Sequence, residues 1–97
     1  MCEYRIRNGI VLEELLGKYL LISTEAVREK CVYIRRIEPI VAYYWDMMEK
    51  GLSIDEMVHQ ASAVFENTDK TVLLKDILDL IEELKEYGYL LKDDETE

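Results

Sequence analysis

The sequence predicts an α+β domain in which a three-stranded antiparallel sheet is followed by three helices, like a winged helix-turn-helix module. Short runs rich in Ile, Leu, Val and Tyr, which are typical of strands, are confined to the first 37 residues. From residue 39 onward, apolar residues recur at helical spacing in three successive segments. Strands that are segregated from helices along a chain are typical of the α+β class.

Three strands are expected, at residues 10–15, 19–22 and 31–37. The dipeptide Gly17-Lys18 supplies a turn between the first two, and the polar segment 24–30 connects the second to the third. Because short sequential connections favour neighbouring strands, we expect the strand order 1-2-3. This order leaves the outer edge of the third strand without a partner.

The helices are expected to begin at residues that suit a helix N-terminus. Pro39 fits the first position of the first helix, where its missing N–H costs nothing. Ser53 and Glu56 fit a capping box at the start of the second helix. The third and longest helix is expected at residues 71–87 and ends at Gly88, which suits a left-handed cap.

The composition points to one acidic domain without a membrane segment. We expect residues 1–91 to form a single domain and residues 92–97 to be an acidic, disordered tail. A net charge of −9 disfavours nucleic acid as a partner, since a phosphate backbone binds Lys and Arg. The apolar runs are shorter than the roughly 20 residues of a membrane helix, and charged residues interrupt the N-terminal segment where a signal peptide needs an apolar stretch. We therefore expect a cytoplasmic protein that does not bind membranes.

No residue pattern in the chain suggests catalysis or metal binding. The two cysteines lie far apart and there is one histidine, which is too few ligands for a zinc site. No Gly-rich phosphate loop and no Ser-His-Asp set is present. We therefore predict no catalytic residue, no metal ion and no cofactor.

Two features indicate a binding surface. The apolar side chains of the third helix cover about half its circumference, more than a surface helix needs, and Leu74 and Leu78 lie on one flank. Either this helix is clamped between two others, or these leucines line a groove that another chain can enter. The open edge of the third strand is flanked by Lys30, Arg35 and Arg36. These cations either guard against aggregation or suit an extended peptide that carries acidic residues.

Three segments of the chain, in order, resemble motifs of one family. Residues 17–23, GKYLLIS, are similar to a Gly-x-Tyr-Leu-Leu-hydrophobic second strand. Residues 37–58 resemble a Leu-Asn-x-x-x-Ala-x-x-Trp-x-x-hydrophobic segment followed by Gly and a Ser or Thr, although Ile37-Glu38 replace Leu-Asn. Residues 76–90 resemble a closing pattern that begins with Asp and ends with Leu-x-x-x-Gly-x-Leu. With these motifs, residues 4–91 resemble the PqqD-like family, the precursor-peptide recognition modules called RiPP recognition elements.

The resemblance implies a winged-helix-like fold and a role without catalysis. Members of the family hold the leader segment of a ribosomally made precursor peptide and present it to a separate modifying enzyme, often a radical SAM protein. The leader adds as a further strand to the third strand and rests against the third helix. On this chain, the resemblance implies a groove between residues 31–37 and 71–82.

The candidate peptide-binding residues come from both walls of this groove. Val32, Tyr33 and Ile34 would give main-chain pairing, Leu74 and Leu78 apolar pockets, and Arg35, Arg36 and Lys75 contacts to leader carboxylates. The full set is Cys31, Val32, Tyr33, Ile34, Arg35, Arg36, Leu74, Lys75, Leu78 and Asp79. Which face of the strand meets the peptide stays open, since a one-residue slip exchanges the two faces.

Two other functions remain open from the sequence. A winged-helix DNA-binding regulator would need a basic recognition helix, whereas residues 71–87 carry more acidic than basic side chains. A structural subunit could form a homodimer by pairing two copies of the third strand edge to edge, and this pairing could coexist with peptide binding.

Overall fold

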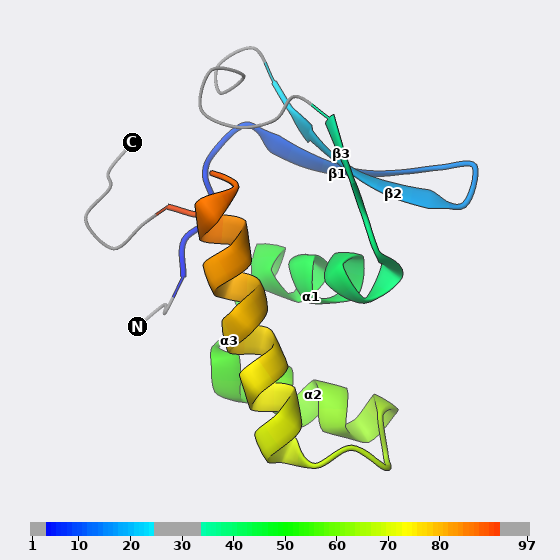
Figure 1. Ribbon diagram of the computed structural model, residues 1–97, viewed down its shortest axis with the longest axis vertical. Coiled ribbons are helices and arrows are strands. Elements are labelled where there is room, and N and C mark those ends of the chain that lie inside the picture. Colours follow the sequence, from blue (N-terminus) through cyan, green and yellow to red (C-terminus); the bar gives the residue numbers. More distant parts are fainter. Residues whose placement is uncertain (1–3, 25–33, 92–97) are drawn as a thin grey trace.

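The computed structural model describes residues 4–24 and 34–91 and confirms the α+β fold, with three strands followed by three helices (Figure 1). The strands form one antiparallel sheet in the order β1-β2-β3, as expected. They are followed by helices that lie below the sheet in the view of Figure 1. The elements are β1 (Ile10–Leu15), β2 (Lys18–Ser23), β3 (Ile34–Ile37), α1 (Pro39–Glu49), α2 (Ile54–Val64) and α3 (Lys70–Glu86).

Several expectations fall on residues outside the described part of the chain. The third strand was expected at residues 31–37, and its described portion is β3. The candidate site residues Cys31, Val32 and Tyr33 lie outside the described residues. The connecting segment beyond Thr24 and the acidic tail at residues 92–97 lie outside them as well.

The turn between β1 and β2 differs by one residue from the sequence prediction. It consists of Leu16 and Gly17, whose φ angles of 52° and 77° are both positive. Two positive φ angles define a type I′ turn, which matches the right-handed twist of the strands it joins. Lys18 consequently belongs to β2, where it lies opposite Leu15.

The register of the sheet separates a buried face from an open one. Leu21 lies opposite Arg35 in β3 and is fully buried among helix side chains. Ile22 and Ile34 form the neighbouring pair, and Ile34 is 50% exposed. Since successive side chains of a strand point to opposite faces, Arg35 and Ile37 belong to the face that meets the helices.

The helices begin much as their sequence signals predict. Pro39 is the first residue of α1, and Ser53 and Glu56 form the expected capping box at the start of α2. The third helix starts one residue earlier than predicted, because the carboxylate of Asp69 accepts a hydrogen bond from the Thr71 N–H at 2.9 Å. Gly88 follows this helix with a φ of 89°, as a left-handed cap requires.

The two described ends of the chain pair with each other and not with β3. The Arg7 N–H donates to the Tyr89 carbonyl at 3.1 Å, and the Leu91 N–H donates to the Arg5 carbonyl at 2.8 Å. These bonds flank a bridge between Ile6 and Leu90. Figure 1 places these two segments beside the last turn of α3, across that helix from the sheet.

Candidate functional site

The hydrogen-bonding phase of the sheet determines which backbone groups of β3 face outward. Directly opposed residues of an antiparallel pair alternate between those that exchange hydrogen bonds and those that do not. A two-residue turn makes Leu15 and Lys18 a hydrogen-bonded pair. The Thr24 N–H donates to the Gly9 carbonyl at 2.9 Å. Thr24 lies six residues, an even number, after Lys18, so this hydrogen bond agrees with the same alternation. Even-numbered residues of β2 therefore bond toward β1, and odd-numbered residues bond toward β3.

The outer edge of β3 presents the backbone groups of Ile34 and Arg36. Leu21 lies opposite Arg35 and Tyr19 lies opposite Ile37, so Arg35 and Ile37 bond to β2. The N–H and C=O groups of Ile34 and Arg36 then point away from β2. Within residues 4–24 and 34–91, no strand pairs with this edge. Among the described residues this edge thus has no partner strand, as strand addition requires.

A trough leads from this edge along α3, with charged and apolar residues lining the part nearest the edge. A cavity of about 260 Å³ lies between β3, the start of α1 and the second half of α3, and Arg35, Ile37 and Tyr87 contribute to its lining. A cavity of about 290 Å³ continues between α1 and the first half of α3. Val41 and Leu80 line both cavities, so the two adjoin. We call the two cavities together the β3–α3 trough.

Arg35 connects the strand to the helix at one end of the trough. Its guanidinium lies 3.9 Å from the centre of the Tyr87 ring, a distance typical of cation–π contacts. Its Nε atom is buried and has no hydrogen-bond partner in the described part of the chain. The Tyr87 hydroxyl donates to the Glu83 carboxylate at 2.8 Å, and this hydrogen bond raises the pKa of Tyr87. A buried donor without a partner favours a ligand that brings an acceptor.

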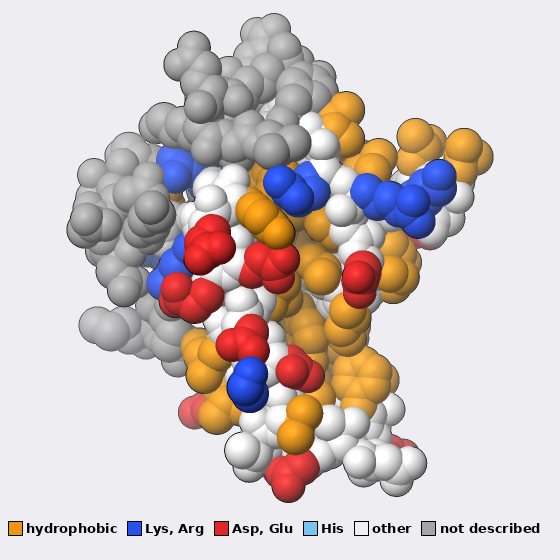
Figure 2. Space-filling model, in the orientation of Figure 1, with side chains coloured by type: hydrophobic (Ala, Val, Ile, Leu, Met, Phe, Trp, Pro, Cys, Tyr) orange, Lys and Arg blue, Asp and Glu red, His pale blue; other side chains and the backbone are white. Residues whose placement is uncertain are grey.

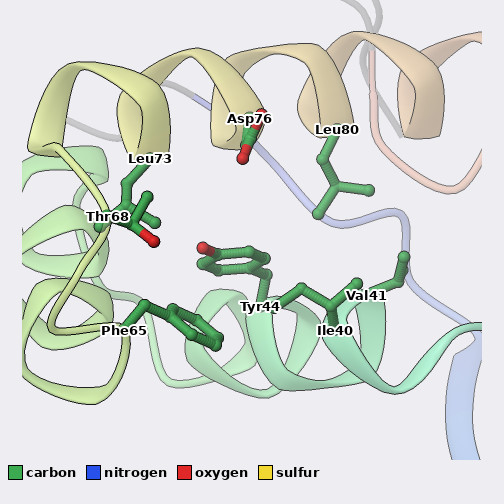
Figure 3. Close-up of a pocket in the computed structure, with 8 residues that line it drawn as sticks. All are labelled: Ile40, Val41, Tyr44, Phe65, Thr68, Leu73, Asp76 and Leu80. Carbon is green, nitrogen blue, oxygen red and sulfur yellow. The ribbon is translucent and has the colours of Figure 1, made fainter.

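The lining of the second cavity is largely apolar, and its polar groups are the Asp76 carboxylate and the hydroxyls of Thr68 and Tyr44. Figure 3 shows Asp76 extending from α3 toward the Tyr44 ring, with Phe65 and Ile40 below. Burial raises the pKa of Tyr44, and the charge of Asp76 raises it further. Asp76 itself forms no hydrogen bond or ion pair with any described residue. The cavity therefore has a negative potential and hydrophobic walls.

The structure distributes the predicted site residues over two surfaces. Arg35 and Arg36 line the trough, and Ile34 contributes backbone groups to its edge. Leu74 and Leu78 line neither cavity and are 37% and 43% exposed on another side of α3. Lys75 and Asp79 form an ion pair of 2.8 Å with each other in solvent and also lie outside the trough.

Sequence reasoning missed most of the trough wall. The walls come from α1 through Ile40 and Val41, and from α3 through Leu80, Glu83 and Tyr87. Leu80 and Tyr87 belong to the central apolar band of the third helix, which the sequence shows as core. A useful signal would have been the apolar pair directly after Pro39, since a helix that starts where a strand ends must lie beside that strand.

The surface around the trough is strongly segregated by charge. Figure 2 shows acidic side chains gathered over α3, a strip of hydrophobic side chains beside them, and basic side chains over the strands. The acidic residues on the exposed sides of α3 are Asp76, Asp79, Glu82, Glu83 and Glu86. Such a helix would be repelled by a phosphate backbone, which disfavours a role as a DNA recognition helix.

Other site types find no support in the described residues. Within residues 4–24 and 34–91, no three His, Cys, Asp or Glu side chains are grouped closely enough to hold a metal ion. None of the helices described here has the length and hydrophobicity needed to cross a membrane.

Comparison with known proteins gives one structural match. The fold is similar to that of TbiB1, solved in complex with the TbiA(beta) leader peptide, with a TM-score of 0.74 and 15% sequence identity. The match covers 96% of this chain and 99% of TbiB1. No protein-family model matches the sequence, and no curated protein matches it. At this low identity the similarity establishes a shared fold.

Proposed function

We propose that this chain is a non-catalytic adaptor that binds the leader segment of a ribosomally made precursor peptide and presents it to a modifying enzyme. The observation that carries this proposal is the backbone edge at Ile34 and Arg36, which has no partner strand among the described residues and borders the β3–α3 trough. The shared fold with TbiB1, a protein solved with a leader peptide bound, supports it. The narrower assignment to the PqqD-like family, and with it a radical SAM enzyme as partner, rests on the motifs at residues 17–23, 37–58 and 76–90.

The guest peptide pairs with β3 as a fourth strand. The outward N–H and C=O groups of Ile34 and Arg36 offer two donors and two acceptors, and an extended peptide satisfies all four. Because alternate side chains of a strand point to the same face, every second guest residue faces the trough. Main-chain pairing thus gives affinity for peptides of many sequences, and side-chain contacts in the trough give specificity for some of them.

The buried Nε of Arg35 belongs to this binding surface. It lies at the end of the trough next to the paired edge, and a guest carboxylate or carbonyl there would satisfy it. The exposed set Leu74, Lys75, Leu78 and Asp79 lies outside the trough. We assign these four residues to guest segments that extend past the trough, or to the modifying enzyme.

A peptide-display selection tests the proposal with the full chain. A library of random 16-residue peptides is selected on the immobilised protein, and a peptide that emerges is titrated by calorimetry. Ile34→Pro removes one outward N–H without removing a hydrogen bond to β2, so we expect its affinity to fall by about tenfold or more. Ile34→Thr is the matched control, since it keeps the N–H and β-branching, and it should bind almost normally.

Two results would contradict the proposal. One is equal affinity of Ile34→Pro and Ile34→Thr for the selected peptide, with both variants folded by circular dichroism. The other is that no peptide is enriched on the protein. If the chain then behaves as a dimer in light scattering and Ile34→Pro makes it monomeric, the edge serves self-association in a structural subunit.

A further inference from the structure

The cavity between α1 and the first half of α3 combines hydrophobic walls with an unpaired carboxylate. Ile40, Val41 and Leu73 give aliphatic contacts, and the rings of Tyr44 and Phe65 give aromatic ones. Asp76 extends into this space from α3 (Figure 3). No described residue forms an ion pair or hydrogen bond with Asp76. A guest side chain that fills the cavity therefore lies beside an exposed carboxylate that has no ion-pair partner among the described residues.

The chemistry of this cavity discriminates between guest side chains. A purely apolar side chain would gain the hydrophobic contacts alone and would leave the negative charge of Asp76 without an opposite charge. An acidic side chain would be repelled. A lysine or arginine packs its aliphatic stem on the hydrophobic walls, places its cation at Asp76, and gains a cation–π contact with a nearby ring. Burial is the main cause of the raised pKa of Tyr44, and the charge of Asp76 raises it further, so Asp76 acts on the aromatic wall of this cavity.

The length of the trough relates this cavity to the paired edge. Tyr87, which lies under Arg35, follows Asp76 by eleven positions, or about 16 Å along a helix. An extended chain advances about 3.3 Å per residue, so this distance corresponds to about five guest residues. A peptide paired with β3 can therefore reach Asp76 without leaving the extended conformation.

We propose that this cavity binds a lysine or arginine side chain, so that the trough selects guest peptides with a cation about five residues from the segment paired with β3. This inference rests on the proposed function, because it specifies the peptide that the trough accepts. It differs from the expectation that guest carboxylates dominate recognition through Arg35 and Arg36. Those carboxylates would lie at the opposite end of the same trough, and the guest would carry opposite charges at its two ends.

The test compares selections of the same random 16-residue library on three full-length proteins. They are the wild type, Asp76→Asn, and the control Asp46→Asn, whose substituted carboxylate is exposed on α1 and lies outside the trough. We expect one position enriched in lysine or arginine on the wild type and on Asp46→Asn. On Asp76→Asn, the enrichment should disappear while peptides are still selected. Thermal melts check that all three proteins are folded.

A titration then measures the contribution of the cation. Replacing that lysine by norleucine in a selected peptide should weaken binding to the wild type by about five- to tenfold, from one ion pair and one cation–π contact. The same replacement should weaken binding to Asp76→Asn by a smaller factor, about two- to threefold, because only the cation–π contact remains to be lost.

The failures of the two proposals are distinguishable. If the three selections give the same consensus, or if norleucine and lysine peptides bind equally to the wild type, the cation site is wrong while the adaptor function stands. A consensus tyrosine at this position would also overturn the cation site, since a neutral donor would then satisfy Asp76. If no peptide is selected on any of the three proteins, both proposals fail.

Discussion

The two sides of α3 differ in how completely they are covered. On one side α3 packs against α2, and Ile77, which is fully buried, lies in the continuous core with Met57 and Ala61. On the side toward β3 and α1, the helix borders two adjoining cavities, and Leu80 and Leu84 there belong to the buried core and also line a cavity. Hydrophobic surface that is not filled by the protein's own side chains is typical of a binding site. The wide apolar face of this helix therefore serves both folding and binding.

Removing a side chain from the packed side should have the largest effect. Ile77→Ala leaves a cavity in a filled core, so the free energy of unfolding should fall by about 2–5 kcal/mol in urea denaturation. Leu78→Ala, one position further on the same helix, removes a side chain that is 43% exposed and should cost less than about 1 kcal/mol. Equal losses for the two variants would contradict the assignment of Ile77 to a filled core and of Leu78 to an exposed surface.

Filling the open side should affect binding and leave the fold stable. Val41 is half-buried and lines both cavities, so Val41→Phe narrows the trough at its centre. We expect about a tenfold loss of affinity for a selected peptide, with the free energy of unfolding changed by less than about 1.5 kcal/mol. Val72→Phe is the control, because Val72 is exposed and lines neither cavity. Binding by Val41→Phe as tight as by the control would exclude the trough as the binding site.

The smallest expected effect is a pH dependence at the start of α2, on the packed side. Hydrogen bonds from the Ser53 backbone N–H, at 2.9 Å, and from its side chain lower the pKa of Glu56. Because the pKa of Glu56 is lower in the folded chain than in the unfolded chain, ionised Glu56 stabilises the fold at pH values above the ordinary glutamate pKa. This stabilisation is lost as the pH falls through the pKa that Glu56 has in the folded chain. The melting temperature of Glu56→Ala should therefore lie below that of the wild type at pH 7, and the gap should shrink toward pH 3. A gap that stays constant, as for the non-titrating control Gln60→Ala, would contradict the capping role.

The parts of the fold that sequence reasoning predicted are those with local signals. Pro39 and the pair Ser53 and Glu56 mark helix starts through chemistry confined to one turn, and the structure confirms them. The turn between β1 and β2 was misplaced by one residue because Leu16 adopts a positive φ, which leucine rarely does. The bridge between Ile6 and Leu90 joins residues at opposite ends of the chain, and no local pattern indicates such a contact.

The candidate site was predictable to a lesser extent. The open edge of β3 follows from the strand order, which short connections determine. The residues of the trough walls could not be predicted in this way. The periodicity of a sequence shows which residues of a helix are apolar, but it does not show which neighbouring element each of them faces. Leu74 and Leu78 were selected as the apolar flank of the third helix, whereas Leu80 and Tyr87 are the helix residues that border β3 across the trough. Asp76 begins the closing motif at residues 76–90, but its place in the cavity beside Tyr44 follows only from the fold.

Amide hydrogen exchange measured by NMR, with and without a saturating selected peptide, tests strand addition to β3 most directly. The backbone N–H groups of Ile34 and Arg36 face outward, so the account predicts that they exchange rapidly alone and become strongly protected in the complex. The N–H groups of Arg35 and Ile37 already bond to β2 and should change much less. Rapid exchange at Ile34 and Arg36 in a saturated complex would show that the peptide binds elsewhere.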